Sequence, residues 1–336
     1  MPFLDSLHKV VARADLTREE AREAMLAILD GAVSTSLIAA FAVALRMKGE
    51  TGTELLGLAL AMRERATPVR VEVDGPLLDT CGTGGDGGGT FNVSTVAAFV
   101  VAGAGVAVAK HGNRSLSSQC GSADVLEELG VTIPMTPQSA ARAIQEIGIG
   151  FLFAPSIHPA MKHAQPARVE LKMRTVFNLL GPLCNPAGAT AQLIGAPSAA
   201  AAELMAEAAM GLGIGRAFVV HGEDGMDEIT TTAPTTLWRT EQGSIEKSVI
   251  TPEDFGVARA SREQLQGGDR AVNAAIARRI LEDEPGAKRD IVLVNAAAAL
   301  VVAGKAAGWK QGMELARASI ASGKALQTLI ALTKVK

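Results

Sequence analysis

The chain has 336 residues, of which 48% are hydrophobic and 20% charged. This composition is that of a folded globular protein with a large core, and the length favours two domains. The formal net charge is −3, so no overall basic field would attract nucleic acid or a membrane surface, and we expect neither as a partner.

The cysteines and the apolar runs point to a cytoplasmic protein. Cys81, Cys120 and Cys184 are too few and too scattered for a disulfide framework, and none has zinc-site spacing. The first residues lack the basic segment and apolar block of a signal peptide. No stretch has the uninterrupted apolar length of a membrane-spanning helix. We therefore expect free thiols in a reducing cytoplasm.

Residues 1–70 show helical patterns only. Thr17-Arg-Glu-Glu20 has the form of a capping box at the start of a helix. Further helices are expected over about 36–48 and from about 53 to just before Pro68. These helices are too apolar and too short to bury one another fully, so a dimer surface and an intrachain core are both open interpretations.

From residue 71 the pattern alternates between short β-prone runs and helices. The expected buried strands are Val106–Ala109, Ile149–Ala154, Gln192–Gly195 and Ala217–Val220. The helical patterns between them cover 122–130, 138–147 and 199–213. Residues 161–182 again favour helix. After Thr230, an irregular strand-like stretch leads into terminal helices from about Asp269. The alternation predicts an α/β domain with a mainly parallel central sheet.

A glycine-rich stretch at residues 79–95, with six glycines, lies between an apolar strand and an apolar helix. A strand, a glycine loop and a helix N-terminus together can receive phosphate on unpaired amides. Asn92, Ser94 and Thr95 lie where their side-chain oxygens can cap the helix or contact phosphate or metal. The spacing fits neither the Walker A loop nor the dinucleotide fingerprint. A flexible linker is the alternative interpretation.

Two more polar clusters follow predicted strands. Lys110-His-Gly-Asn-Arg114 lies at the carboxyl end of its strand, where open α/β sheets bind ligands. Lys110 there suits a phosphate and Asn113 an acceptor, whereas an ordinary surface lysine is the alternative. His111 either positions the loop or lines the acceptor's entrance. Residues 117–122 then open a helix and offer hydroxyls and amides to phosphate.

The second cluster is acidic. Asp227 and Glu228 follow the strand at 217–220, and carboxylates are the hard oxygen ligands that Mg²⁺ prefers. Neighbouring residues of an extended chain point opposite ways, so the pair serves two metal ions or contains a turn. An exposed acidic loop without a ligand is the alternative.

Four segments together resemble anthranilate phosphoribosyltransferases, in order and in register. They are Gly82-Thr-Gly-Gly-Asp86 with Asn92-Val-Ser-Thr95, Lys110-His-Gly-Asn-Arg-Ser115, Arg174-Thr-Val-Phe-Asn-Leu-Leu-Gly-Pro182, and His221-Gly-Glu-Asp-Gly-Met-Asp-Glu228. The resemblance implies transfer of a phosphoribosyl group from 5-phosphoribosyl 1-diphosphate to anthranilate in tryptophan biosynthesis. It also implies a helical domain of residues 1–70, joined by about 161–188, which forms a homodimer. An α/β domain of residues 71–160 and 189–336 would bind the diphosphate substrate.

The resemblance also implies site residues. Those for phosphoribosyl diphosphate are Gly82, Thr83, Gly84, Gly85, Asp86, Thr90, Asn92, Ser94, Thr95, Lys110 and Ser122. Those for anthranilate are Gly82, His111, Asn113, His158 and Arg168. Ser94, Asp227 and Glu228 would bind Mg²⁺, two ions per subunit. An arginine can grip a carboxylate with two parallel N–H bonds, but spacing alone does not choose Arg168 over Lys162, Lys172 or Arg174.

No general base is assigned, because the aromatic amine of anthranilate is already neutral near pH 7 and catalysis can rest on positioning and charge stabilisation.

Thr80 and Cys81 stand where the family usually has aliphatic residues, and Lys172 where glycine is frequent; we expect none of them to touch the proposed contacts. A pyrimidine-nucleoside phosphorylase and a catalytically silent nucleic-acid-binding relative are the alternatives. The Asp227-Glu228 pair argues against the first and the acidic net charge against the second.

Overall fold

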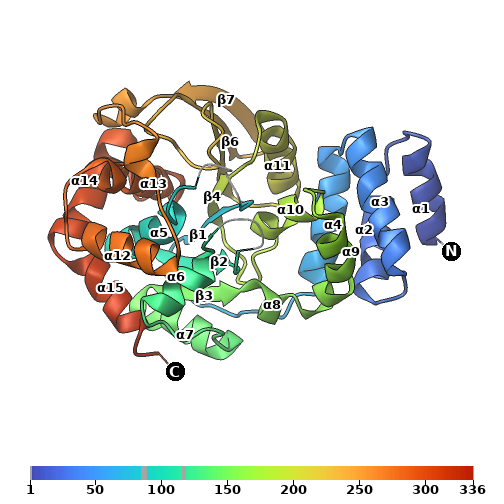
Figure 1. Cartoon of the computed structure of the whole chain (residues 1–336), viewed down its shortest axis with the longest axis horizontal. Helices are drawn as coiled ribbons and strands as arrows, with labels where there is room; N and C mark the ends of the chain where they lie inside the picture. The colour runs from blue at the N-terminus through green and yellow to red at the C-terminus, as the bar shows by residue number, and fades with distance from the viewer. Residues whose placement is uncertain (1, 85–88, 116–118, 336) are drawn as a thin grey trace.

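The computed structural model describes residues 2–84, 89–115 and 119–335, and consists of a small group of helices beside a larger α/β unit (Figure 1). The N-terminal helices are α1 (Pro2–Val11), α2 (Arg18–Leu29), α3 (Thr35–Lys48) and α4 (Gly52–Glu64). The capping box at Thr17 is confirmed, because its hydroxyl accepts from the Glu20 amide and the Glu20 carboxylate returns to the Thr17 amide. Helix α1 was not expected.

The α/β unit is built on a seven-stranded sheet in the order β3-β2-β1-β4-β5-β6-β7. Its strands are β1 (Leu77–Gly82), β2 (Ala107–Gly112), β3 (Ile149–Phe153), β4 (Ala191–Gly195), β5 (Arg216–Gly222), β6 (Thr235–Glu241) and β7 (Ser244–Ile250). Strands β1 to β5 pair in parallel, and β6 and β7 are antiparallel. The mainly parallel sheet is therefore confirmed. Since the chain runs outward from β1 to β3 and then restarts at β4 on the other side of β1, the strand order reverses between β1 and β4.

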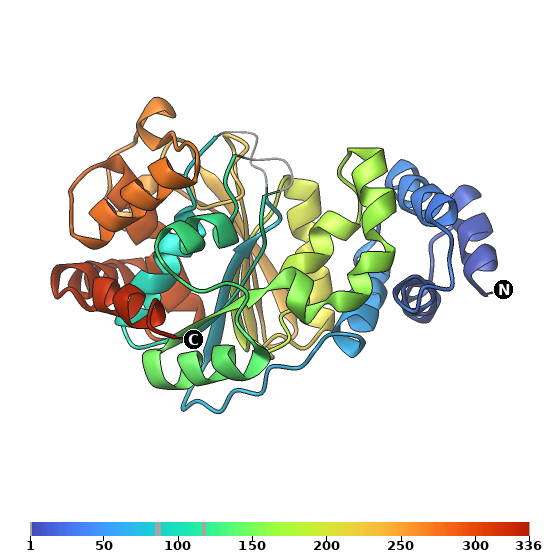
Figure 2. The ribbon, with the colours of Figure 1, turned by 60° about the horizontal axis from the view of Figure 1, so that its bottom comes forward.

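Helices cover both faces of the sheet, which Figure 2 shows nearly edge-on. One face carries α5 (Val93–Gly103), α12 (Arg270–Leu281), α13 (Ala287–Val302), α14 (Trp309–Ala321) and α15 (Lys324–Leu332). Near β2 and β3 lie α6 (Ser122–Glu128) and α7 (Pro137–Ile147), and the opposite face carries α11 (Ala199–Gly211). Successive strand residues point to opposite faces, so Phe218 belongs to one hydrophobic cluster and Val219 to the other.

The second of these clusters joins the N-terminal helices to the sheet. It combines side chains of α2, α3 and α4 with those of α11 and with Val219. The contact is close: a Cβ added at Gly211 would lie 2.5 Å from Leu56 Cδ2. Part of the apolar surface of the N-terminal helices is therefore buried within the chain.

The stretch 161–182 is not a continuous helix, contrary to expectation. After α8 (Ala154–Ile157) the chain forms η1 (Pro159–His163), α9 (Gln165–Leu171), α10 (Phe177–Leu180) and η2 (Gly181–Leu183). Lys172 ends α9 with φ of 46°, the left-handed conformation that favours glycine at a helix C-terminus. This backbone agrees with the expectation, from the resemblance, of glycine at this position. No helix in the described part of the chain is both long and apolar enough to cross a membrane.

Candidate functional site

The strand order reverses between β1 and β4, and the carboxyl ends of strands at such a reversal are the usual ligand site of open α/β sheets. Four predicted residues, which we call the diphosphate side, gather at this edge: Ser94, Lys110, Asp227 and Glu228. Glu228 Oε1 accepts the Ser94 backbone N–H at 3.1 Å, and Lys110 Nζ lies 3.5 Å from Ser94 Oγ. Residues from β2, α5 and the connection after β5 thus meet within hydrogen-bonding distance.

Lys110 is only 3% exposed, so the surface-lysine alternative is wrong. Its ammonium group donates to the Thr80 carbonyl oxygen, and the Thr80 hydroxyl donates to the Ser94 carbonyl at 3.1 Å. The expectation that Thr80 touches no proposed contact is therefore also wrong. Among the described residues, the Lys110 ammonium group hydrogen-bonds to neutral oxygens, so it is available to attract an anionic ligand.

Beneath Lys110 lies a buried carboxylate that the sequence did not single out for a role. Asp79 is fully buried, and its Oδ1 accepts the His111 backbone N–H at 3.1 Å. Its Oδ2 accepts from Asn185 Nδ2 at 2.8 Å. Burial raises the pKa of Asp79, and the charge of Lys110 opposes that rise. The position of Asp79, an acidic residue next to the apolar start of β1, could have indicated a role in the site. No feature of the sequence marks Asn185.

The acidic pair lies in a bend, so its residues are not arranged as in an extended strand. Asp227 packs against two glycines at the strand ends. A Cβ added at Gly82 would lie 2.8 Å from Asp227 Oδ2, and one at Gly195 would lie 1.7 Å from the Asp227 carbonyl oxygen. Any side chain at Gly195 would push the acidic bend away from the sheet. Here glycine is required for close approach of the backbone.

Hydrogen bonds within the connection after β5 fix the shape of the bend. Asp224 Oδ2 accepts from the hydroxyl of Thr230 at 2.6 Å and also from the hydroxyl of Thr232. Its Oδ1 accepts from the Met226 backbone N–H at 3.2 Å. Asp224, which was not predicted to bind metal, therefore shapes the loop.

The donor set suits magnesium. Two carboxylates and the Ser94 hydroxyl are hard oxygen ligands. In the described ranges, no three His, Cys, Asp or Glu side chains converge to form a metal site of their own. Mg²⁺ is commonly bound by one or two carboxylates together with substrate phosphates, and these residues fit that arrangement.

The remaining residues predicted for the diphosphate have mixed placements. Asn92 stands at the N-cap position of α5 but makes no capping bond; it donates to the Cys120 carbonyl and accepts from Asn273. The buried Thr83 hydroxyl has no partner among the described residues, and Thr95 is buried. The Gly84 carbonyl accepts from Arg174 Nη2 at 2.8 Å. Thr90 forms an isolated bridge to Gln266. Gly85 and Asp86 lie outside the described residues.

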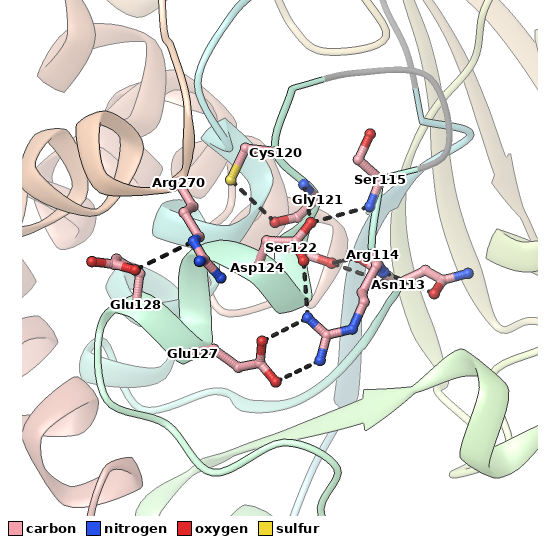
Figure 3. Close-up of polar contacts among 10 residues, drawn as sticks. All are labelled: Asn113, Arg114, Ser115, Cys120, Gly121, Ser122, Asp124, Glu127, Glu128 and Arg270. Atoms are coloured by element: carbon pink, nitrogen blue, oxygen red, sulfur yellow. Dashed lines mark hydrogen bonds and ion pairs between the residues drawn. The ribbon is translucent and has the colours of Figure 1, made fainter.

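Ser122 and Asn113 belong to one tightly bonded loop (Figure 3). Ser122 Oγ accepts the Asn113 backbone N–H at 3.1 Å and donates to its carbonyl at 3.2 Å. Gly121 stands at the N-cap position of α6, and Asp124 Oδ2 accepts its N–H at 2.9 Å. Arg114 pairs with Glu127 through two bonds of 2.6 Å. The Ser122 hydroxyl is therefore committed to closing the loop.

Two buried histidines, His111 at the end of β2 and His158 after α8, lie together. The rings of His111 and His158 have centroids 5.3 Å apart. Burial lowers the pKa of His111 to about 3, with His158 as a further cause, and burial lowers that of His158 to about 4. Both rings are therefore neutral at pH 7. His111 Nδ1 lies 3.0 Å from the Gly181 carbonyl, so it carries the proton and Nε2 is left as an acceptor.

The polar atoms of these rings are poorly satisfied. Among the described residues, neither His111 Nε2 nor either ring nitrogen of His158 makes a well-formed hydrogen bond, although the Cys184 backbone lies close enough to His158 to oppose the fall in its pKa. Buried polar atoms of this kind are normally bonded to protein, water or ligand. They are therefore candidates to contact an acceptor molecule.

The residues predicted to bind anthranilate include Arg168 on α9, and we call Arg168, His111 and His158 the acceptor side. Burial lowers the pKa of the Arg168 guanidinium group. Arg174, by contrast, is bonded to Gly84, and Lys162 and Lys172 are exposed. Among the described residues, the side chain of Arg168 makes no hydrogen bond or ion pair, and no polar contact joins it to His111 or His158; only its backbone N–H is bonded, to the Ala164 carbonyl at 3.2 Å. A half-buried guanidinium without a counter-ion suits an incoming carboxylate.

Known proteins match the chain over nearly its whole length. The glycosyl transferase family helical bundle domain matches residues 4–66, and the glycosyl transferase family a/b domain matches residues 74–326. An anthranilate phosphoribosyltransferase of Solibacter usitatus is 59% identical, covering 99% of this chain and 98% of that protein. One of Chloroflexus aggregans is 52% identical, covering 98% and 97%.

Solved structures agree with the sequence matches. The anthranilate phosphoribosyltransferase of Thermus thermophilus has a TM-score of 0.93 at 47% identity, covering 98% of each chain. That of Saccharomyces cerevisiae, in complex with PRPP and Mg, has a TM-score of 0.91 at 27% identity, covering 99% of this chain and 97% of that one. Together with the buried cationic and acidic groups at the strand ends, these matches show that the chain belongs to the anthranilate phosphoribosyltransferase family.

Proposed function

We propose that this chain transfers the phosphoribosyl group of 5-phosphoribosyl 1-diphosphate to anthranilate, forming N-(5-phosphoribosyl)anthranilate and diphosphate in tryptophan biosynthesis. The observation that carries the proposal is the meeting of Lys110, Ser94 and Glu228 at the reversal of strand order. The yeast relatives support it, because their structures are in complex with PRPP and Mg and with 4-fluoroanthranilate.

The reaction breaks the bond between C1 of the ribose and the diphosphate oxygen and forms a bond from C1 to the anthranilate nitrogen. The diphosphate leaves with the bonding electron pair, and the amine proton passes to solvent. Lys110 and the amides near the start of α5 stabilise the departing charge. Arg168 binds the anthranilate carboxylate, and the neutral histidines contact the remaining polar atoms. This division of roles needs positioning and no strong base.

Magnesium belongs to the proposal as a charge-neutralising partner of the diphosphate. Asp227, Glu228 and Ser94 would hold it, and the ion supplies positive charge when bound. We include two ions per subunit in the proposal, because the two carboxylates have different neighbours: Asp227 lies against Gly82 and Glu228 accepts the Ser94 backbone N–H. The proposed reaction would take place in the cytoplasm.

A homodimer through the N-terminal helices is the second part of the proposal. Exposed apolar side chains support it on three of the elements concerned: Val11 of α1 is 64% exposed, Met47 of α3 is 70% exposed and Val169 of α9 is 56% exposed. Sedimentation equilibrium of the wild-type chain should give twice the chain mass, and Met47→Glu should lower it toward the monomer. A wild-type monomer would refute the dimer.

The activity is tested by mixing the purified chain with phosphoribosyl diphosphate, Mg²⁺ and anthranilate and following anthranilate fluorescence. We expect a loss of signal that requires all three components and equimolar release of diphosphate. An unchanged signal with folded protein would refute anthranilate as the acceptor. Diphosphate release with another aminobenzoate would retain the reaction class and change the substrate.

A further inference from the structure

Ile229, the residue directly after the acidic pair, is hydrogen-bonded through its backbone to a side chain of α13. Asn295 of α13 has an exposed fraction of 0%. Its Oδ1 accepts the Ile229 backbone N–H at 3.0 Å, and its Nδ2 donates to the Ile229 carbonyl at 2.9 Å. The same Nδ2 donates to the Ile291 carbonyl one turn earlier on α13, also at 2.9 Å. One amide therefore satisfies both backbone polar groups of Ile229.

The chemistry of this contact is specific to an amide. The position requires one acceptor and two donor hydrogens in a fixed plane, and among side chains of this size only asparagine supplies them. The surrounding residues of α13 from Ile291 to Val302 are otherwise apolar and buried. A polar group in such a helix is costly unless fully bonded, so the amide has a role that a hydrophobic residue would not fill.

Helix α13 is packed firmly against the elements that carry the site, so it can hold the acidic bend in place. It has 16 residues and packs against α5, the helix that carries Ser94, and against β4. Asp224 fixes the bend from within through Thr230 and Thr232. Asn295 fixes it from outside at the residue next to Glu228.

We propose that Asn295 is a positioning residue that holds Asp227 and Glu228 where a divalent cation and the diphosphate meet. This inference rests on the proposed function, because it assigns the acidic pair to metal. Without the Asn295 amide, the acidic bend would keep its internal hydrogen bonds, but its position relative to Ser94 and Lys110 would no longer be fixed. Residues that orient metal ligands typically change metal affinity about 10–100-fold when they are replaced.

The test uses the full chain with Mn²⁺ as the probe, measured by the electron paramagnetic resonance signal of free Mn²⁺ in the presence of phosphoribosyl diphosphate. Asn295→Asp keeps the shape but removes both donors, and Asn295→Ser removes most of the contact while adding no charge. The matched control is Ser319→Ala, which removes a buried 2.7 Å bond from Ser319 Oγ to the Val100 carbonyl in the same helical layer. All three variants should lower the thermal midpoint.

Only the Asn295 variants should weaken Mn²⁺ binding, by about 10–100-fold, and raise the Mg²⁺ concentration for half-maximal activity by a similar factor. Their kcat at saturating Mg²⁺ should stay within a few-fold of wild type. Unchanged Mn²⁺ affinity in a destabilised Asn295→Ser would overturn the proposal and leave Asn295 a packing residue. If wild type itself binds no Mn²⁺ and needs no Mg²⁺, the proposed metal site is refuted instead. Should Asn295→Asp fail to fold, Asn295→Ser decides.

Discussion

The diphosphate side and the acceptor side meet on β2, which carries Lys110 and His111, and they satisfy their polar groups in different ways. On the diphosphate side Lys110, Ser94 and Glu228 are joined by hydrogen bonds that cross between β1, β2, α5 and the connection after β5. On the acceptor side, three ring nitrogens of His111 and His158 make no well-formed hydrogen bond among the described residues, and Arg168 has no described counter-ion.

The difference agrees with what the proposed function requires of each side. A diphosphate with metal needs several charges in fixed relative positions before it arrives, because a pre-organised site does not have to reorient during the reaction. An aromatic carboxylate needs a dry, mostly neutral pocket with one cation. Substitutions that disrupt one side at a time should therefore show which substrate that side binds.

The largest loss is expected from Glu228→Gln. The amide oxygen can still accept the Ser94 N–H, so the fold should persist, but the negative charge for a metal is gone. We expect kcat/KM for phosphoribosyl diphosphate to fall about 10²–10³-fold, measured by initial rates over a range of Mg²⁺ concentrations. Glu223→Gln, exposed in the same connection, is the control and should behave as wild type. A fall of less than about threefold would remove Glu228 from the site.

Arg168→Ala should have the next largest effect, on the acceptor alone. Loss of a charge-assisted pair worth about 1.5–3 kcal/mol should raise KM for anthranilate about 10–100-fold and leave KM for phosphoribosyl diphosphate unchanged. Arg168→Lys should recover only part of the loss, because an ammonium lacks the planar fork. Lys162→Ala, exposed nearby, serves as the control. Equal effects on both substrates would contradict the separation.

The buried histidines predict a pH dependence of stability. Their folded pKa values of about 3 and about 4 lie below the ordinary value of 6.5, so the unfolded chain binds more protons below pH 6.5. Their contribution is complete above pH 6.5 and is lost as the pH falls through 4 and 3, at up to about 1.4 kcal/mol per pH unit for each histidine.

Denaturant unfolding between pH 7 and pH 4 checks this dependence. The double variant His111→Gln/His158→Gln should show a shallower decline than wild type, by close to two protons. His8→Gln, exposed on α1, should retain the wild-type slope. An unchanged slope in the double variant would show that the pair is not held neutral by burial.

The smallest effect is expected far from both sides of the site. Thr17→Ala removes the hydroxyl that caps α2 and should lower the free energy of unfolding by about 1 kcal/mol. Substrate KM values should stay the same, as steady-state rates would show. A change in either KM would mean that the N-terminal helices are coupled to the site.

Sequence reasoning succeeded where the signal was local. The capping box at Thr17, the start of α12 after Asp269 and the buried parallel strands follow from short-range patterns that one segment contains by itself. The prediction of helix over 161–182 was wrong, because the helix-favouring composition outweighed Pro166, which stands in the first turn of α9, and the left-handed turn at Lys172.

The missed site residues depend on contacts between distant segments. Asp79 and Asn185 are 106 positions apart, and Ile229 and Asn295 are 66 apart. No periodicity or spacing joins such pairs, because tertiary packing alone brings them together. The same holds for Thr80, whose carbonyl reaches Lys110 only when β1 and β2 pair.

The central claim is that the diphosphate side and the acceptor side bind different substrates, and paired calorimetric titrations test it most directly. Phosphoribosyl diphosphate with Mg²⁺, and then anthranilate, are titrated into wild type, Glu228→Gln and Arg168→Ala. We predict that Glu228→Gln weakens binding of the diphosphate substrate, while Arg168→Ala weakens only anthranilate, by about tenfold or more. If Arg168→Ala weakened the diphosphate substrate as much as anthranilate, the division of the site would be contradicted.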